Sequence, residues 1–364
     1  MPPWSTIIDS GPVPGSVDYT TLVLIHGFTW HAPVFERLLP LAAAHNVRIV
    51  APARYDYPGS ASYSATERER LARLLKASPE SKDAFADAHD VALDRAREVH
   101  DFLCDLVRRE PSLPRRADGG GIVLVGWSMG TLWATAFLAY APDIVAETSE
   151  SEGSALGGRA APDLSSYVRR VVLYDGIAGF FGFEDPEGTY SPTRDQSLSG
   201  AERFDAFDAW VGGYYDHGER IGLETRAATP VASSLPGLTP EQRAACTCRT
   251  PWGEQGEGSD MGMIILWAVH GISGLTKERA FYLEPDAHRS GWEEVEVRVV
   301  WCDRSIWPSA WAGKRLEEEL AAAREDGKAM RKVQVARFRG ANHMAHWDMP
   351  ERALSAFLGD GEEA

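Results

Sequence analysis

Residues 122–140 read IVLVGWSMGTLWATAFLAY, and this stretch decides the fold. Its first part, Ile122–Val125, is an apolar run of the kind that forms a strand buried on both faces of a parallel sheet. Its last part, Thr131–Tyr140, is typical of a helix. Between them, GWSMG at 126–130 has the pattern Gly-x-Ser-x-Gly, which makes a tight strand-to-helix turn with the serine at its tip. The helix N-terminus behind Ser128 favours negative charge there, so this serine is a candidate nucleophile.

Similar apolar runs on both sides of this stretch predict five further strands. They are Thr21–Ile25, Val47–Ala51, Val168–Tyr174, Val295–Trp301 and Val333–Phe338. Strands that alternate with helices are typical of a doubly wound, mostly parallel α/β sheet. The alternation is interrupted once, by a long segment rich in aromatic residues. We therefore expect an α/β core over residues 1–175 and 291–364 and an inserted cap over residues 176–290.

The charge balance of the chain argues against two classes of partner. Of its 364 residues, 37 are Lys or Arg and 53 are Asp or Glu, which gives a formal net charge of −16. Nucleic acids and anionic membranes are bound through clustered positive charge, so we expect neither as a partner. The partner we expect is a small-molecule substrate. No pattern in the sequence predicts the oligomeric state.

Cysteine usage and the lack of ligand clusters predict a protein without a metal or cofactor. The four cysteines are too few and too scattered for a disulfide framework: Cys104, Cys246, Cys248 and Cys302. The pair at 246 and 248 has no second pair nearby, so we expect no zinc site. The first ten residues lack a basic stretch followed by an apolar run, and the longest apolar stretches are far shorter than the roughly 20 residues that span a membrane. We therefore expect a cytoplasmic protein.

A serine nucleophile needs a base, and His343 is the histidine best placed for that role. It follows the last predicted strand, in GANH at 340–343. This position puts it on a loop at the carboxyl end of the sheet, the same edge as Ser128. His346, three residues further on, is the alternative candidate for the base. The other interpretation of His346 is a surface histidine at the start of the closing helix.

An acyl-transfer site also needs donors for an oxyanion. One candidate is the backbone N–H of Met129, directly after the nucleophile. The second is the backbone N–H of Phe28, in HGFTW at 26–30 after the first predicted strand. The residues expected at the mouth of the site, where they would bind substrate, are Trp30, His31 and Trp127.

Aromatic residues are dense in the expected cap, from Phe180 to Trp267. One interpretation is an apolar pocket for a bulky acyl or alcohol group, since ligand pockets are mostly apolar with a few polar anchors. The other is that these aromatic residues form the hydrophobic core of the cap itself. Both interpretations fit the sequence.

Four segments give the chain a resemblance to the α/β-hydrolase superfamily: LIHGF at 24–28, DYPGS at 56–60, GWSMG at 126–130 and GANHMAHWDMP at 340–350. The resemblance implies that fold, with a cap between its sixth and seventh sheet strands and a triad in the order serine, acid, histidine. The chain is also similar to a group of fungal hydrolases of unassigned substrate. Epoxide hydrolases and haloalkane dehalogenases of this superfamily carry aspartate at the turn, so Ser128 argues against their reactions.

The acid of the triad has two candidates. In most relatives it follows the seventh strand, but here that segment reads Cys302-Asp303-Arg304-Ser305, with Ser305 in the usual acid position. Asp303 lies two residues early, which is a shift of about 6–7 Å along a strand. Asp175 directly follows Val168–Tyr174, a position from which some lipases and fungal lactone hydrolases of this fold take their acid. We favour Asp175 and keep Asp303 as the alternative.

Together these features predict a serine hydrolase that cleaves a carboxylic ester or lactone of a bulky apolar substrate through an acyl-enzyme. Two alternatives stay open. A peptidase or amidase of the same fold would hold the amine of its substrate with cap carboxylates, for which the candidates are Glu184, Asp185, Asp205 and Asp208. A ligand-binding homologue would keep the triad but turn over slowly.

Overall fold

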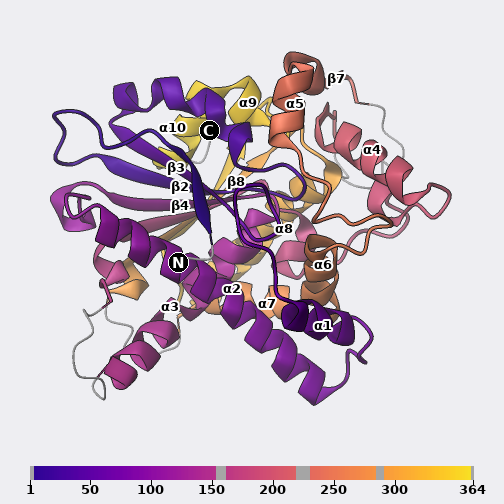
Figure 1. The fold of residues 1–364 in the computed structure, drawn as a ribbon, viewed down its shortest axis with the longest axis horizontal. Coiled ribbons are helices and arrows are strands. Elements are labelled where there is room, and N and C mark those ends of the chain that lie inside the picture. The colour runs from indigo at the N-terminus through magenta and orange to yellow at the C-terminus, as the bar shows by residue number, and fades with distance from the viewer. Residues whose placement is uncertain (1–3, 153–160, 219–229, 284–290, 362–364) are drawn as a thin grey trace.

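A computed structural model describes residues 4–152, 161–218, 230–283 and 291–361, and these residues form a central sheet of seven strands (Figure 1). The strands are β1 (Ser5–Asp9), β2 (Thr20–Ile25), β3 (Val47–Ala53), β4 (Gly121–Trp127), β5 (Val168–Tyr174), β8 (Glu296–Cys302) and β9 (Val333–Phe338). Their spatial order is β1-β3-β2-β4-β5-β8-β9. Only β1 runs antiparallel to its neighbour in this sheet. This confirms the predicted doubly wound, mostly parallel α/β sheet.

All six predicted strands are present, with ends that differ from the prediction by at most two residues. The seventh, β1, is not predicted by the sequence pattern because Ile8 is the one buried residue among its five. An edge strand that buries so little apolar surface gives almost no hydrophobic periodicity.

Helices cover both faces of the sheet. On one face, η1 (Ala32–Leu41) packs with α9 (Ala345–Asp348) and α10 (Pro350–Leu358). On the other face, α3 (Gly130–Glu152) packs against both α2 (Lys82–Arg109) and α7 (Ile272–Phe281) (Figure 1). The apolar stripe of α2, which is buried, supplies the surface for this packing: Ala92, Ala96, Val99, Leu103 and Leu106. α8 (Trp307–Glu325) packs on β8 and β9.

Within the described residues, the segment between β5 and β8 adds no strand to the central sheet. It holds η5 (Ala178–Phe181), η6 (Pro192–Arg194), α4 (Gly200–Val211), β6 (Gly213–Tyr214), β7 (Ala232–Ser233), η7 (Leu235–Gly237), α5 (Pro240–Cys246), α6 (Ser259–Val269) and α7. Because α7 packs against α3, the end of this segment lies in the helical layer on the sheet. The domain boundary expected at residue 290 falls outside the described residues.

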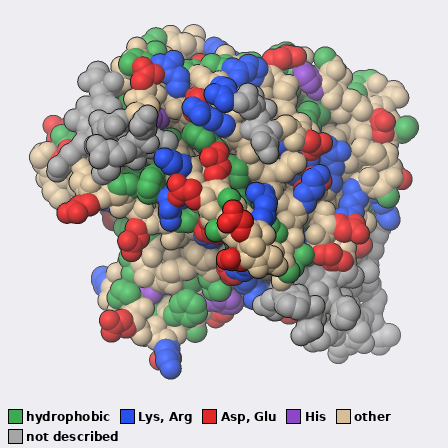
Figure 2. All heavy atoms as spheres, turned by 180° about the vertical axis from the view of Figure 1, so that it is seen from behind, with side chains coloured by type: hydrophobic (Ala, Val, Ile, Leu, Met, Phe, Trp, Pro, Cys, Tyr) green, Lys and Arg blue, Asp and Glu red, His purple; other side chains and the backbone are tan. Residues whose placement is uncertain are grey.

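Shorter elements complete the described chain: α1 (Ala65–Leu74), η2 (Ala43–His45), η3 (Arg116–Asp118), η4 (Leu164–Ser166) and η8 (Trp292–Glu294). In the ranges that the structure covers, no helix combines the length and apolar character needed to cross a membrane. On the face seen in Figure 2, Lys and Arg side chains lie among Asp and Glu side chains. The four cysteines are free thiols.

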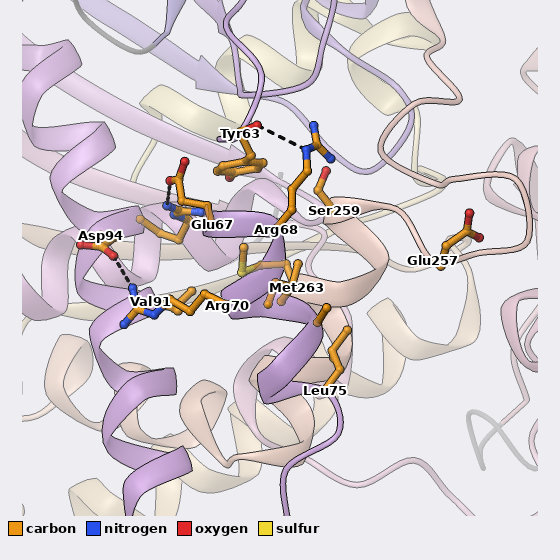
Figure 3. A pocket seen from close by; sticks show the side chains of 13 residues that line it. Tyr63, Glu67, Arg68, Arg70, Leu75, Val91, Asp94, Glu257, Ser259 and Met263 are labelled. Atoms are coloured by element: carbon orange, nitrogen blue, oxygen red, sulfur yellow. Dashed lines mark hydrogen bonds and ion pairs between the residues drawn. The ribbon is translucent and has the colours of Figure 1, made fainter. Parts of the chain in front are cut away.

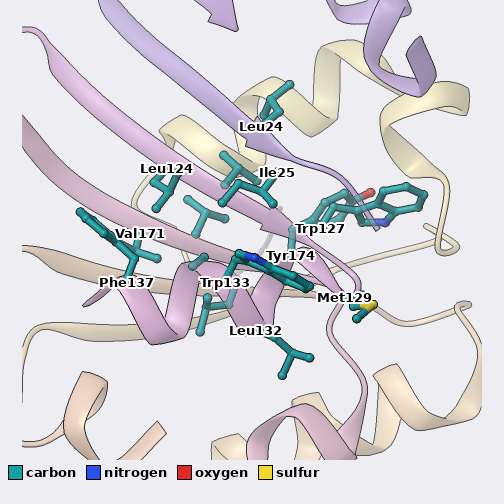
Figure 4. Packing of buried hydrophobic residues seen from close by; sticks show 14 of the residues in the cluster. Leu24, Ile25, Leu124, Trp127, Met129, Leu132, Trp133, Phe137, Val171 and Tyr174 are labelled. Carbon is teal, nitrogen blue, oxygen red and sulfur yellow. The ribbon is translucent and has the colours of Figure 1, made fainter. Parts of the chain in front are cut away.

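The turn between β4 and α3 is surrounded by buried apolar residues (Figure 4). Trp127 and Met129, on either side of Ser128, are at most 1% exposed, and so are Leu132 and Trp133 on the first turn of α3. Close packing of large side chains leaves little freedom for local movement. The strand before the serine and the helix after it are therefore both anchored in the core.

Candidate active site

Ser128 occupies the sharp turn between β4 and α3, with a backbone φ of 52° in the left-handed region that residues with a side chain rarely adopt. Its N–H donates to the carbonyl of Tyr174 at 2.8 Å, which ties the turn to β5. Close approaches explain both glycines of the motif. A Cβ on Gly126 would lie 2.5 Å from the Gly130 oxygen, and a Cβ on Gly130 would lie 2.3 Å from the Ile25 oxygen. The motif thus encodes a strained turn that holds the serine at the carboxyl end of β4.

His343 follows β9 and meets Asp175, which follows β5. Its Nδ1 lies 2.6 Å from Oδ2 of Asp175, and at most 3% of either side chain is exposed. Because a carboxylate accepts the hydrogen bond, the proton of the neutral ring stays on Nδ1 and Nε2 is a free base. The carbonyl of His343 accepts the indole N–H of Trp127 at 2.9 Å, which fixes the loop against the serine turn.

Two further donors hold the Asp175 carboxylate. The Cys302 N–H donates to Oδ1 at 2.8 Å, and the Ser305 hydroxyl donates to Oδ2 at 2.5 Å. Asp175 itself has a left-handed φ of 51°, and its carbonyl accepts the Ser309 hydroxyl at 3.0 Å. Hydrogen bonds of this kind offset the cost of burying a carboxylate and fix its direction.

The alternative residues raised by the sequence lie elsewhere. Asp303 accepts hydrogen bonds from Arg337 Nε at 3.1 Å and from the Gly340 N–H at 2.7 Å, so β9 and the loop after it occupy its carboxylate. The His346 ring is buried against the rings of Trp127 and Phe35. Burial holds the pKa of His346 well below its usual range. Of the two candidate acids, Asp175 is therefore the one that the structure brings to His343.

The backbone amides of Phe28 and Met129 are both unpaired within the described part of the chain, where neither donates to a protein acceptor. Phe28 is 6% exposed and Met129 is fully buried, and buried N–H groups without a partner are rare in proteins. The turn that carries Phe28 lies close to Ser128, since a Cβ on Gly27 would be 3.1 Å from Cβ of Ser128. Two free amides on the two turns beside a serine could bind an oxyanion.

Ser128, His343 and Phe28 line one cavity with a volume of about 520 Å³. Most of its wall is apolar and comes from the segment between β5 and β8 and from the start of α8, including Phe180, Phe207, Trp210, Ile264, Ile265 and Trp307. Part of the lining is polar and includes Asp185 and Arg194, which form an ion pair at 2.8 Å. No three or more His, Cys, Asp or Glu residues in the described ranges are grouped so that they could hold a metal ion.

Aromatic residues of the expected cap take both of the roles considered above. Phe180 and Trp210 line the cavity. Phe207 does so too, and it also packs with Trp252 and Phe28, with ring centroids 5.3–5.7 Å apart. This ring cluster supports the turn that carries the Phe28 amide.

Trp30, His31 and Trp127 are not among the residues that line this cavity. Each is at most 3% exposed. Trp127 packs on Phe35 because successive side chains of a strand point to opposite faces, and its side chain goes into the core beside η1. Burial lowers the pKa of His31 to about 4, so its ring is neutral at physiological pH.

A second cavity, of about 200 Å³, lies between α1, α2 and the start of α6 (Figure 3). Two pairs of its charged side chains form ion pairs, Arg70 with Asp94 at 2.9 Å and Arg95 with Glu67 at 3.5 Å. Ser259 and Met263 of α6 line this second cavity, whereas Ile264 and Ile265 of the same helix line the first. α6 therefore separates the two cavities.

Sequence patterns miss two features of the site. The hydroxyl of Ser305 donates to the carboxylate of Asp175, and the signal available for it is the serine at that place in the segment Cys302-Asp303-Arg304-Ser305. Arg54 and Asp260 form a buried ion pair behind the Phe28 turn. They are 206 residues apart, so no sequence spacing predicts that they pair. The sequence shows only that Arg54 is a charged residue at the end of an apolar strand, where it would need a partner.

A Gly-x-Ser-x-Gly turn at the carboxyl edge of a mostly parallel α/β sheet, beside a buried histidine, defines the class of α/β hydrolases. The chain belongs to the alpha/beta hydrolase family, whose sequence profile matches residues 22–356. No curated protein matches the chain in a sequence comparison.

Several solved structures resemble this chain at low sequence identity. A bromoperoxidase from Bacillus anthracis is 15% identical, with a TM-score of 0.45 over 94% of this chain and 92% of that one. A carboxylesterase from the ammonia-oxidizing thaumarchaeon Nitrososphaera gargenis is 12% identical, with a TM-score of 0.49 over 98% and 93%. A mutant of epoxide hydrolase from Solanum tuberosum is 12% identical, with a TM-score of 0.48 over 92% and 90%.

Proposed function

We propose that this chain is a serine hydrolase in which Ser128 is the nucleophile, His343 is the general base and Asp175 is the acid that orients the base. The observation that carries the proposal is the buried hydrogen bond of 2.6 Å between His343 and Asp175, beside the cavity that Ser128 lines. A histidine held in this way keeps its second ring nitrogen available for the proton of a hydroxyl group.

The proposed reaction is an acyl transfer in two halves. His343 removes the proton of the Ser128 hydroxyl while Oγ attacks the carbonyl carbon, and the N–H groups of Phe28 and Met129 hold the resulting oxyanion. His343 then protonates the leaving alcohol, which leaves an acyl group on Ser128. Water attacks this acyl-enzyme with His343 again as the base, and the carboxylic acid and the free serine are released.

The substrate that we propose is a small carboxylic ester or lactone with a bulky apolar group. Support comes from the cavity, whose volume of about 520 Å³ and mostly apolar wall suit such a group. The polar side of the cavity, with the Asp185–Arg194 ion pair, would face the more hydrophilic end of the substrate.

Ion pairs within the protein disfavour the peptidase alternative. A substrate amine would need a carboxylate without a partner, but three of the four candidate acids are paired. Asp185 pairs with Arg194, Asp205 with Arg249, and Asp208 with Arg243. A cation already compensates each of these charges, so they offer little attraction to an ammonium group.

The proposal is tested by assaying the purified protein against p-nitrophenyl esters, lactones, aminoacyl-naphthylamides and a fluorophosphonate probe. We expect ester or lactone turnover and labelling of Ser128 in the wild type. Ser128→Ala should abolish labelling and lower turnover by a factor on the order of 10⁴ or more. Ser166→Ala, at a partly exposed serine in η4, is the control and should behave as wild type. Near-normal labelling and turnover in Ser128→Ala would refute the proposal.

A further inference from the structure

Behind the turn that carries Phe28, the protein buries a complete ion pair. Arg54 donates to both oxygens of Asp260, from Nη1 at 2.9 Å and from Nη2 at 2.7 Å. Only 1% of each side chain is exposed. Arg54 follows β3, whereas Asp260 belongs to the first turn of α6. A buried ion pair adds little net stability over well-packed apolar residues of similar volume, so stability alone does not account for it.

The same arginine holds the carbonyl oxygen of Gly27. Arg54 Nη2 donates to this oxygen at 2.8 Å, and His26 Nδ1 donates to it at 3.0 Å. The His26 proton lies on Nδ1 because Nε2 accepts the N–H of Arg54 at 3.1 Å. Burial, with the Arg54 charge nearby, holds the pKa of His26 well below its usual range, so the ring stays neutral. Since a peptide unit is planar and trans, fixing the Gly27 carbonyl also fixes the direction of the Phe28 N–H.

Tyr57 holds the next peptide unit. Its hydroxyl donates to Oδ2 of Asp260 at 2.7 Å and accepts the N–H of Thr29 at 2.9 Å. Thr29 has a left-handed φ of 62°, a conformation that persists only where surrounding contacts impose it. The two peptide units that flank Phe28 are thus both tied to Asp260, one through Arg54 and the other through Tyr57.

The charge of Arg54 also makes the Phe28 N–H a stronger donor. A cation at the carbonyl oxygen polarises the whole peptide unit, because linked hydrogen bonds strengthen one another at low dielectric. Asp260 balances the arginine, so the peptide is polarised without a net charge behind the site.

The segment that carries Asp260 also forms the cavity wall. Met261 and Ile264, one and four residues further along α6, line the cavity. The backbone before α6 pairs with the Phe28 turn, since the Cys248 N–H donates to Thr29 O at 2.7 Å and the His31 N–H donates to Cys246 O at 2.8 Å.

We propose that Asp260, Arg54 and Tyr57 are positioning residues for the Phe28 amide, so that α6 sets the oxyanion donor as well as shaping the cavity. This inference rests on the proposed function and deepens it. The oxyanion is common to all ester substrates, whereas the acyl chain is not. Loss of the cluster therefore lowers kcat for every ester by a similar factor, whatever the length of its acyl chain.

The test uses two variants, each with a matched control, in the full-length protein. Tyr57→Phe removes one hydroxyl and keeps the ring, and its control is Tyr63→Phe, because the buried hydroxyl of Tyr63 has no hydrogen-bond partner among the described residues. Asp260→Asn keeps the shape of the side chain, and its control is Asp208→Asn, a buried aspartate of the same segment that pairs with Arg243. We would measure kcat and KM for p-nitrophenyl acetate and octanoate and the affinity for a trifluoromethyl ketone.

We expect Tyr57→Phe and Asp260→Asn to lower kcat by about 10- to 100-fold for both esters, with KM changed by less than about threefold. Affinity for the ketone, which forms a tetrahedral adduct, should fall by the same factor as kcat/KM. Both controls should stay within about threefold of the wild type. Equal kcat in the two tyrosine variants, or a loss confined to KM or to octanoate, would overturn the inference.

Hydrogen exchange separates this inference from the proposed function. Amides of residues 26–31 should exchange faster in Tyr57→Phe and Asp260→Asn than in their controls, because the Thr29 and Gly27 contacts are weakened. If the wild type hydrolyses no ester, the proposed function fails, but exchange still decides whether the cluster orders the turn. Unchanged exchange in both variants overturns the inference whatever the wild-type activity.

Discussion

Asp175 and His343 are 168 residues apart in the chain, and their side chains meet at 2.6 Å because β5 and β9 end at the same edge of the sheet. β8 lies between these two strands. The loop after β8, where most relatives carry the acid, supplies Ser305 instead, and its hydroxyl donates to the Asp175 carboxylate. Asp175 and the serine that donates to it thus follow neighbouring strands.

We expect Asp175→Asn to lower kcat by a factor of up to about 10⁴, because the carboxylate fixes the tautomer of His343 and stabilises its charged form. Asp303→Asn, the matched control, should keep kcat within about threefold, since Asp303 contacts β9 and the loop after it rather than the histidine. Steady-state kinetics on a p-nitrophenyl ester, with the free energy of unfolding measured for each variant, provides the check. If kcat fell by this large factor in Asp303→Asn but stayed nearly unchanged in Asp175→Asn, Asp303 and not Asp175 would be the acid that orients His343.

Ser305→Ala removes one donor from the buried carboxylate but leaves the other donors in place. We expect kcat to fall by about tenfold or less and the free energy of unfolding to fall by about 1.5–3 kcal/mol, the usual contribution of a hydrogen bond to a charged group. Ser273→Ala is the control, because the Ser273 hydroxyl is similarly buried and has no hydrogen-bond partner in the described part of the chain. Urea denaturation and kinetics measure both effects, and a variant with wild-type kcat would show that Ser305 does not help to orient the acid.

Substitutions on α6 should change the preference for acyl length. Ile264→Ala enlarges the cavity and should raise KM for p-nitrophenyl octanoate by about 3- to 10-fold, since each buried methylene contributes about 0.8 kcal/mol, with little change for acetate. Ala268→Trp fills the same cavity and should exclude the longer ester while acetate is still hydrolysed. Phe85→Ala, at an exposed position on α2, is the control. Equal changes for both esters would mean that α6 does not contact the acyl chain.

Glu98 should give folding a pH dependence of definite sign. Burial raises the pKa of Glu98 to about 7, from an ordinary value of 4.5. Because the folded pKa is the higher one, the stability that this group contributes is complete below pH 4.5 and is lost as the pH rises through 7, an amount on the order of 3 kcal/mol. Glu98→Gln should therefore flatten the fall in unfolding free energy between pH 5 and pH 8, as measured by urea denaturation, whereas the exposed Glu147→Gln should not. If the unfolding free energy of wild type and of Glu98→Gln changed in parallel between pH 5 and pH 8, this prediction would be wrong.

The sequence by itself determined the mostly parallel sheet, the serine turn and the loop position of His343. Each of these depends on consecutive residues, since a strand buried on both faces needs an unbroken apolar run and a tight turn needs glycines at fixed places. The sequence pattern does not predict the short edge strand β1, because this strand buries one side chain and shows no apolar periodicity.

Only the tertiary structure decided which acid meets His343, where Trp127 goes, and what supports the Phe28 turn. The choice between Asp175 and Asp303 depends on how three loops from β5, β8 and β9 pack together at the sheet edge. The Arg54–Asp260 pair joins the end of β3 to α6, across 206 residues. Such contacts form when distant segments of the chain pack against one another. Their geometry depends on the arrangement of the whole core, so the spacing of residues along the sequence does not predict them.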